Sequence, residues 1–325
     1  MIKIITAPDF SKKQIIVVFF NEGEKLSLSN SNLIVKDKSE KIKLQCTCYR
    51  IFIVFGIGHC SITSALIQAA KKFGFFIALM TPGFRLYSIV GAEKDSNFLL
   101  HKKQYNYEGI DLAKHITKNK INNQKLELKS VRNKNDLICD AIEKLTNYME
   151  CIDNATSVNE IMAYEGLSSK LYFKNHFNNV LWNGRQPRIK KDYINSTLDI
   201  GYTLLFTFID ALVSSYGFDT YCGVLHKQFY MRKSLVCDFV EPFRPIIDHT
   251  IKKGINLKQI KPEDFIINNN QYRLLWKESP RYTELLLKPL LTHKDDIFQY
   301  IQSYYRAFMK DLPSSEFPIY NLTEE

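Results

Sequence analysis

The sequence predicts an α+β, multi-domain protein, with a small β-rich domain over residues 1–96 and a larger all-α domain over residues 97–325. Two observations lead to this prediction. Short apolar runs and alternating segments, separated by turn residues, fill the first part of the chain. Long stretches with the helical spacing of apolar residues fill the second part. A hydrophobic content of 45% is ample for an ordered core in 325 residues.

The β-rich domain is expected to contain several strands and one helix. Residues 61–74 have helical spacing, with Ser61 as the N-cap and Gly74 where the helix would end. Residues 25–37 alternate around Asn30-Ser31-Asn32, as a hairpin does. The other expected strands lie in residues 14–20, 42–57, 75–81 and 84–92, the last two separated by a Pro82-Gly83 turn.

The larger domain is expected to be helical throughout, because no convincing strand follows Asn97. Loops are expected near residues 119–134 and 182–191, with another within residues 216–234. The long helical patterns are "DLICDAIEKLTNYMECI", "VNEIMAYEGLSSKLYFKNHF", "DYINSTLDIGYTLLFTFIDALVSSYG" and "HKDDIFQYIQSYYRAFMKDL", which begin at residues 136, 158, 192 and 293.

Composition excludes several classes of protein. No apolar run reaches the ~20 residues that cross a bilayer, so no membrane association is expected. The N-terminal "MIKIITAPDF" is interrupted too soon by Pro8 and Asp9 for a signal peptide. The 7 cysteines form no C-x-x-C pair, which argues against a disulfide framework or a thiolate zinc site and favours the reducing cytoplasm.

The net charge of +10 is unevenly distributed along the chain. Residues 170–191 contain six basic side chains and no acidic one. Such a stripe suits a polyanion, because each neutralised phosphate releases counterions. The alternative is the compositional bias of a sequence that is rich in Lys, Asn and Ile throughout. Charge alone therefore leaves nucleic-acid binding open.

The segment "SLVCDFVEPFRPIIDH", residues 234–249, carries acids within an apolar helical pattern. Asp238 and Glu241 stand together on a helical wheel, away from the apolar arc. The ordinary interpretation is an amphipathic helix with a solvated acidic face. Pro242 and Pro245 argue against it, because a proline costs ~3 kcal/mol inside a helix. Either the helix starts or kinks here, or something beyond propensity holds the backbone.

Two further residues depart from the pattern. Glu165 falls on a helical wheel beside Ile161, Ser168 and Tyr172, where a carboxylate must be paired, protonated or bound to a cation. An ion pair with a nearby lysine is the alternative. His226 lies in the loop expected before the acidic segment. Two carboxylates and one imidazole suit a hard divalent ion such as Mg²⁺ or Mn²⁺, and they do not resemble a structural zinc site.

These segments keep a recognisable order over about 80 residues. A Glu-Gly helix ends in Tyr-Phe, an Arg-rich stretch leads to Asp, Asn and then Gly-Tyr, a Gly-x-Asp segment runs into Leu-His, and an Asp-x-x-Glu-x-Phe-Arg-Pro helix follows. The residues concerned are Glu165-Gly166, Tyr172-Phe173, Arg185, Arg188, Asp192, Asn195, Gly201-Tyr202, Gly217, Asp219, Leu225-His226, Arg232, Ser234-Leu235, Asp238, Glu241 and Phe243-Arg244-Pro245. In this the chain resembles the universal CRISPR-associated (Cas) endonuclease and integrase of spacer acquisition, and its N-terminal layout is similar too.

The resemblance implies a metal-dependent DNA endonuclease and integrase. In it, the 3′-hydroxyl of a short DNA fragment attacks a phosphodiester at a CRISPR repeat, and water in its place makes the reaction a hydrolysis. Glu165, His226 and Glu241 would bind one Mg²⁺ or Mn²⁺ ion, with Asp238 nearby as an auxiliary acid, so these four are the expected catalytic residues. The side chains expected to contact DNA are Arg185, Arg188, Lys190, Lys191 and Arg232.

The resemblance also implies partners. They are double-stranded DNA with 3′ ends, a CRISPR repeat target, a second copy of the chain that pairs through the β-rich domain, and a small ferredoxin-like CRISPR-associated subunit. The helical domain would be catalytic. Two other hypotheses stay open: a transposon-encoded integrase relative that moves its own element, and a non-catalytic nucleic-acid-binding scaffold. The presence of all four metal-site residues disfavours the scaffold.

Overall fold

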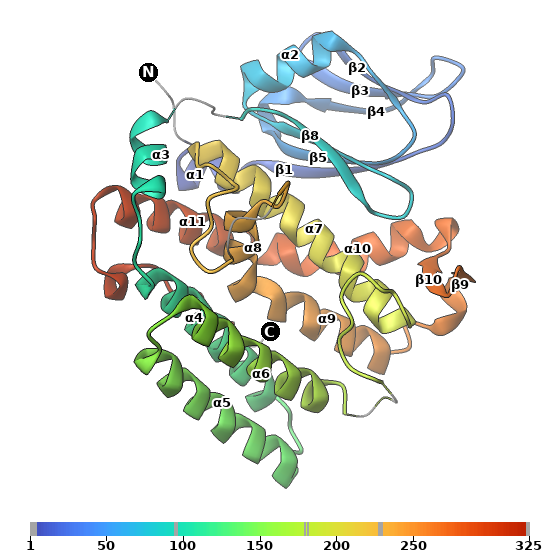
Figure 1. Cartoon of the computed structure of the whole chain (residues 1–325). Helices are drawn as coiled ribbons and strands as arrows, with labels where there is room; N and C mark the ends of the chain where they lie inside the picture. Colours follow the sequence, from blue (N-terminus) through green and yellow to red (C-terminus); the bar gives the residue numbers. More distant parts are fainter. Residues whose placement is uncertain (1–4, 94–96, 179, 181, 227–229, 323–325) are drawn as a thin grey trace. The chain divides into compact units, whose positions relative to one another are not determined.

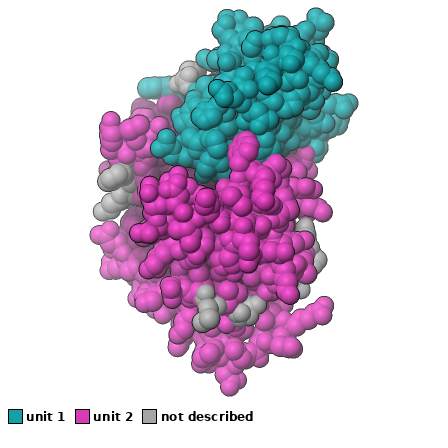
Figure 2. Space-filling model, turned by 90° about the vertical axis from the view of Figure 1, so that its right-hand side faces the viewer, with its two compact units in different colours: residues 1–98, 207–218 teal, residues 99–206, 219–325 magenta. Residues whose placement is uncertain are grey.

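A computed structural model describes residues 5–93, 97–178, 180, 182–226 and 230–322 (Figure 1). The chain divides into two compact units, which we call unit 1 (residues 1–98 and 207–218) and unit 2 (residues 99–206 and 219–325) (Figure 2). Unit 1 is rich in strands and unit 2 in helices, so the predicted α+β fold class is confirmed. Residues 207–218 join unit 1 although they belong to a helix that begins in unit 2.

Unit 1 contains two four-stranded sheets. One has the order β1-β5-β7-β8, with two parallel pairs and an antiparallel β7–β8 pair. The other has the order β4-β3-β2-β6 and is antiparallel except for β2–β6. The elements are α1 (Ala7–Ser11), β1 (Gln14–Phe20), β2 (Lys25–Ser29), β3 (Asn32–Lys36), β4 (Ile42–Thr47), η1 (Cys48–Arg50), β5 (Ile51–Gly58), β6 (Ser61–Ile62), α2 (Ser64–Phe73), β7 (Phe76–Met80) and β8 (Leu86–Gly91).

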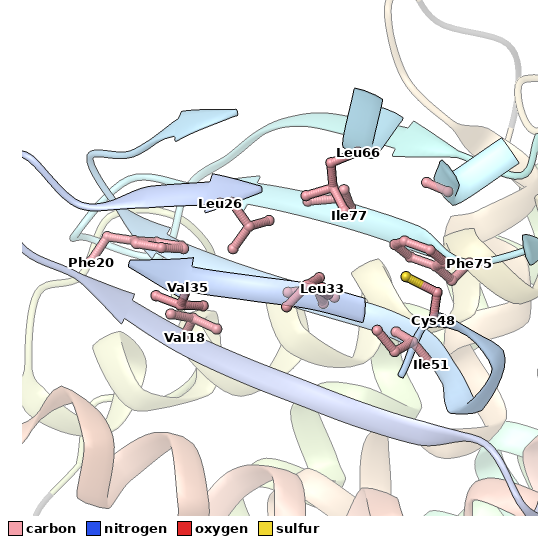
Figure 3. Close-up of a cluster of buried hydrophobic side chains, with 12 residues drawn as sticks. Val18, Phe20, Leu26, Leu33, Val35, Cys48, Ile51, Leu66, Phe75 and Ile77 are labelled. Carbon is pink, nitrogen blue, oxygen red and sulfur yellow. The ribbon is translucent and has the colours of Figure 1, made fainter. Parts of the chain in front are cut away.

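The core of unit 1 is apolar (Figure 3). Leu26 and Leu33 of one sheet and Leu66 of α2 are fully buried in it. β5 is buried along its whole length, which fits its continuous apolar sequence. Phe52 of β5 also contacts Phe208, from the second half of α7, at 5.8 Å between ring centroids. Burial of apolar area at about 25 cal/mol per Å² is therefore the main source of stability here.

Most local predictions for unit 1 are confirmed. The hairpin turns at Asn30 and Ser31, whose φ angles of 47° and 59° match the type I′ turn that joins twisted strands. Gly74 ends α2 in the left-handed conformation, with φ of 75°. The predicted N-cap was wrong, because α2 begins after Thr63. Ser61 instead belongs to β6, where it pairs with Lys25.

Unit 2 is built from long helices and one small hairpin. Helices α4, α5 and α6 pack against one another (Figure 1). Its elements are α3 (Phe98–Tyr105), α4 (Asp111–Lys129), α5 (Asp136–Asn154), α6 (Val158–His176), α7 (Tyr193–Tyr216, shared with unit 1), α8 (Ser234–Val240), η2 (Glu241–Phe243), α9 (Arg244–Asn256), η3 (Pro262–Asp264), β9 (Phe265–Asn268), β10 (Gln271–Leu274), η4 (Trp276–Glu278), α10 (Ser279–Thr292), α11 (Lys294–Met309) and η5 (Ser314–Glu316).

Two predictions for this part were wrong. Residues 119–129 are helical and not a loop, because α4 runs to Lys129. Much of the buried face of α4 is polar, so the apolar period that signals a helix is missing from its sequence. Strands do occur after Asn97, in the β9–β10 hairpin. These strands have four residues each, and their turn residues Asn269 and Asn270 both have positive φ.

Helix α4 is fastened by a segment near the other end of the chain. Asn119 donates to the carbonyl of Tyr320 at 2.6 Å and accepts from its backbone N–H at 3.0 Å. Asn123 bonds the carbonyls of Tyr320 and Pro242, each at 2.9 Å, and accepts from the N–H of Leu322 at 3.0 Å. Two buried amides thus fix the position of α4 by hydrogen bonds that a helix could not supply itself.

Helix α7 has 24 residues and is long and apolar enough to cross a membrane by length and composition, contrary to the expectation from its sequence. However, 83% of its most apolar window is buried inside the protein. That burial is typical of a core helix, which is apolar all round because protein surrounds it.

Candidate metal centre

The segment of residues 234–249 is not one continuous helix. Helix α8 ends at Val240, a single 3-10 turn follows, and α9 begins at Arg244. Pro242 and Pro245 each stand in the first turn of their element, where the missing N–H is not needed. The interpretation of a solvated acidic face was wrong, because Asp238 is 0% and Glu241 3% exposed. Both carboxylates therefore need partners inside the protein.

Asp238 binds the loop that carries His226. Its Oδ2 accepts from the N–H groups of Val224 at 2.6 Å and Leu225 at 3.1 Å, and its Oδ1 accepts from that of His226 at 2.9 Å. Oδ1 also lies 2.7 Å from Nδ1 of the His226 ring. An imidazole held through Nδ1 by a carboxylate presents Nε2 to a ligand, as metal-binding histidines usually do. Asp238 thus orients His226.

Gly223 allows this loop to lie close to α8. A Cβ atom at this position would come within 2.8 Å of Asp238 Oδ2, the carbonyl oxygen of His226 and Cβ of Ser234. The carbonyl oxygen of His226 belongs to the backbone and Cβ of Ser234 is fixed to it, so the loop itself would have to move. In the sequence this glycine indicates only a loop, and its steric role follows from the fold.

Glu165 and Glu241 meet at Lys120, which sequence reasoning did not single out. Nζ of Lys120, on α4, contacts Oε1 of Glu165 and lies 2.6 Å from Oε2 of Glu241. Ser169 donates to Glu165 at 2.9 Å, and Arg244 lies 3.1 Å from Oε1 of Glu241. The ion pair that was the alternative for Glu165 is therefore present. The sequence does contain one indication that Lys120 is buried: it follows Ile116 by one helical turn and so lies on the buried face of α4.

The electrostatics of this cluster favour charged forms. Burial alone would raise the pKa of Glu241, but Arg244, Lys120 and His226, in that order, outweigh it and lower the pKa to about 2. Burial likewise lowers the pKa of Lys120, yet Glu165 and Glu241 hold it above its usual value. Asp238 contacts His226, Lys120 contacts both glutamates, and Asp238 and Glu241 are close in the sequence, so the four expected catalytic residues lie in one region of unit 2.

Within the described part of the chain, no three His, Cys, Asp or Glu side chains already lie in an arrangement that could hold a metal ion. The donor set nevertheless suits a hard divalent cation, since Glu165 and Glu241 supply carboxylate oxygens and His226 supplies one ring nitrogen. Oε2 of Glu241 is buried and lies against a cation already, since the ammonium of Lys120 is 2.6 Å from it. The ammonium of Lys120 contacts the carboxylate oxygens that such an ion would take.

A second buried polar network lies beside the cluster. Arg244 stacks over the ring of Tyr202 at 4.6 Å, and the Tyr202 hydroxyl donates to Asp248 at 2.5 Å. Burial raises the pKa of Asp248 to about 7, and only part of that rise is cancelled by Tyr202 and Arg244. Nδ1 of His249 lies 3.0 Å from Glu127 at the edge of this network. Helix α9 therefore contributes to both networks.

The residues predicted to contact DNA have different surroundings. Arg188 and Lys191 are exposed, and Lys190 is half-buried with a lowered pKa because of its burial. Arg185 is already engaged, since it lies 2.6 Å from Asp199 and stacks on Tyr202 at 5.3 Å. Nε of Arg232 is buried and has no hydrogen-bond partner. Two of the five side chains thus stand out as solvent-exposed cations.

These observations define a two-unit α+β protein whose helical unit gathers two glutamates, an oriented histidine, a buried lysine and a partly exposed arginine. The family model for CRISPR associated protein Cas1 matches residues 17–286, and the chain belongs to that family. The "CRISPR-associated endonuclease Cas1 1" of Francisella tularensis subsp. novicida is 27% identical over 244 residues, which cover 71% of this chain and 76% of that relative.

Solved structures agree in fold. A chain of a "Cas6-RT-Cas1--Cas2 complex" superposes with a TM-score of 0.82 at 22% identity, over 96% of this chain and 36% of that one. A "Casposase bound to integration product" superposes with a TM-score of 0.76 at 20% identity, over 96% of each chain. At these identities the likeness shows the fold and leaves the site to be argued from its own residues.

Proposed function

We propose that this protein is a divalent-metal-dependent DNA endonuclease and integrase, which inserts short DNA fragments into a CRISPR array. The proposal rests on one observation. In a chain of the Cas1 family, Glu165 and Glu241 both contact the ammonium of Lys120. The names of the curated relatives as endonucleases, and of the casposase as bound to an integration product, support a phosphodiester reaction.

The residues divide the work as follows. Glu165, Glu241 and Nε2 of His226 would hold one Mg²⁺ or Mn²⁺ ion, which when bound polarises the phosphodiester and stabilises the charge that develops on it. Asp238 fixes the His226 ring through Nδ1. Arg244 keeps Glu241 ionised, and therefore able to bind a cation. The exposed Arg188 and Lys191 would contact phosphates and position the DNA strand.

The partners are proposed on similar grounds. The structural neighbour named as a Cas1–Cas2 complex supports a small CRISPR-associated subunit as partner. Pairing of two copies through unit 1 and a cytoplasmic location remain proposals. An integrase that moves its own transposon would share this site, and the likeness to a casposase favours that candidate as the second one.

An integration assay tests the proposed function. The purified protein and its partner subunit are mixed with a short duplex and a repeat-bearing plasmid in Mn²⁺. We expect Glu165→Ala, His226→Ala and Glu241→Ala each to reduce strand transfer and cleavage to background, because each removes a ligand. Glu143→Ala, an exposed carboxylate on α5, should retain activity.

Two further arms separate the possible reactions. A duplex that lacks its 3′-hydroxyls should abolish strand transfer and leave cleavage by water intact. A plasmid that carries a transposon target in place of the repeat should be a poor substrate, and a preference for it would favour the transposon hypothesis. Full activity of any one of the three alanine variants would remove that residue from the site.

A further inference from the structure

Lys120 is a lysine where a metal-binding site would not ordinarily carry one. It is 5% exposed, and its ammonium contacts the two glutamates that stand on other elements, Glu165 on α6 and Glu241 in η2. A buried lysine must be paired, because an uncompensated buried charge is very costly. The contact of Lys120 with the two glutamates is therefore part of the packed interior. By contrast, the ion pair between Lys118, on the same helix, and Asp153 is partly exposed.

We propose that Lys120 is the internal counter-cation of the metal centre, and that its ammonium gives up the two carboxylates when a divalent ion binds. The inference rests on the proposed function and concerns the same site. Without the ion, Lys120 holds Glu165 and Glu241 together. With the ion bound, Lys120 is a positioning residue that has moved away.

The contact atoms require an exchange. An Mg²⁺ ion coordinates oxygen ligands at about 2.0–2.1 Å. Lys120 already contacts Oε1 of Glu165 and Oε2 of Glu241, and its contact with Glu241 is 2.6 Å long. An ammonium and a metal ion cannot both occupy the space between these oxygens at such distances. The flexible four-carbon stem of lysine allows its charged end to move.

The charges point to the same conclusion. Two carboxylates are balanced by two cations in this cluster, Lys120 and Arg244. An ion with two positive charges added to this neutral set would repel Lys120 strongly at a separation of a few ångströms. Movement of the ammonium relieves the repulsion. Lys120 thus stabilises the metal-free protein and lowers its affinity for the ion.

The test uses the full-length protein without DNA, so that its readouts do not depend on catalysis. Mn²⁺ binding is measured by calorimetry and by the loss of the free Mn²⁺ spectrum in electron paramagnetic resonance. Melting temperatures are measured in chelator and in saturating Mn²⁺. The variants are Lys120→Met and Lys120→Gln, and Lys118→Met is the matched control on α4.

Both Lys120 variants should bind Mn²⁺ at least about tenfold more tightly than the wild type, because a repelling charge is gone. They should melt lower in chelator, and Mn²⁺ should raise their melting temperature more than it raises that of the wild type. Lys118→Met should bind Mn²⁺ as the wild type does. If Lys120→Met does not fold without metal, Lys120→Gln, which can still hydrogen-bond to both glutamates, carries the comparison.

Two results would overturn the inference, and they differ in what else they overturn. Unchanged or weaker Mn²⁺ binding by both Lys120 variants, with normal binding by the wild type, would remove only the counter-cation role. Absence of Mn²⁺ binding in the wild type and in every variant would reject the metal centre itself, and with it the proposed function.

Discussion

The two units of this protein bury different kinds of side chain. Among the described residues of unit 1, the buried charged side chains are Glu24 and Asp210. Unit 2 buries Lys120, Asp238, Glu241 and Asp248, together with a series of amides and hydroxyls. The two units therefore rely on different sources of stability, although both are well-packed parts of one chain.

The difference shows where stability and function are separated. Apolar burial is non-directional and tolerates many sequences, so the sheets of unit 1 need only hydrophobic side chains of suitable size. A buried charge is costly unless each partner is in place, and replacing such pairs with apolar groups is often neutral or stabilising. The charges of unit 2 are thus poorly explained by stability alone, and the metal-binding role that we propose would account for them.

The largest effect on stability is expected from the core of unit 1. Leu33→Ala should destabilise this unit by about 2–5 kcal/mol, because it removes a fully buried side chain and leaves a cavity. Urea denaturation followed by fluorescence and circular dichroism measures the loss. Ile42→Ala, at a position 49% exposed on β4, should cost far less. Mn²⁺ affinity should stay unchanged in both, and a loss of affinity would show that the units are not separable in this way.

In unit 2 the largest expected effect is on Mn²⁺ affinity. Gly223→Ala should lower Mn²⁺ affinity about 10–100-fold, as is typical when the support of a metal-binding histidine is disturbed, because the new methyl group would displace the loop from Asp238. Gly166→Ala is the control, since a Cβ there meets no atom within 4 Å. Calorimetry with Mn²⁺ measures both variants. Equal affinities would show that the position of the loop does not matter.

Asp248 should make stability depend on pH. Its pKa is raised to about 7 in the folded protein, so between pH 4 and 7 the folded state holds a proton that the unfolded state has released. Stability should therefore fall as pH rises through this range, by up to about 1.4 kcal/mol per pH unit. Asp248→Asn should remove this slope. Urea denaturation at pH 5 and pH 7 checks it, and parallel slopes for the two proteins would contradict the assignment.

The smallest effects are expected at the surface. Replacement of both Arg188 and Lys191 by Gln should weaken binding to unrelated DNA sequences about equally. The slope of log affinity against log salt should shrink by roughly 0.7–0.9 for each phosphate that is no longer neutralised. Lys41→Gln, on the exposed surface of unit 1, should change this slope much less. Similar losses in the two proteins would mean that the positive charge is a general property of the surface.

Most strands of unit 1 were predictable, because the local sequence specifies them; β6 was missed, since Ser61 was expected to be a helix cap. Alternation around Asn30-Ser31 and the glycine at 74 specify a turn and a helix end within a few residues. The cluster around Lys120 was predictable only in part. Glu165 was recognised because a carboxylate at that place on the wheel needs a partner, and the lysine alternative was stated without a candidate.

The partner could not be identified because it is a contact through space. Lys120 is one of many lysines in its stretch, and its place one helical turn after Ile116 is a weak local sign of burial that does not name its partners. The same reason explains the loop predicted across α4, whose buried face carries Asn119, Asn123 and Glu127 in place of apolar residues. The burial of Asp238 could not be read from the sequence either, since its partners are backbone N–H groups.

The hydrogen bonds of Asn119 and Asn123 that fix α4 also determine when, during synthesis, this helix can reach its final position. Asn119 and the Tyr320 segment that it binds are 201 positions apart. At a translation rate of about 5–20 residues per second, roughly 10–40 s pass between the two. During that interval α4 lacks the hydrogen bonds that fix it. For more than half of the interval Glu241, the partner of Lys120, has not yet been synthesised. A nascent chain on the ribosome therefore carries the strands of unit 1 long before it carries both glutamates that contact Lys120.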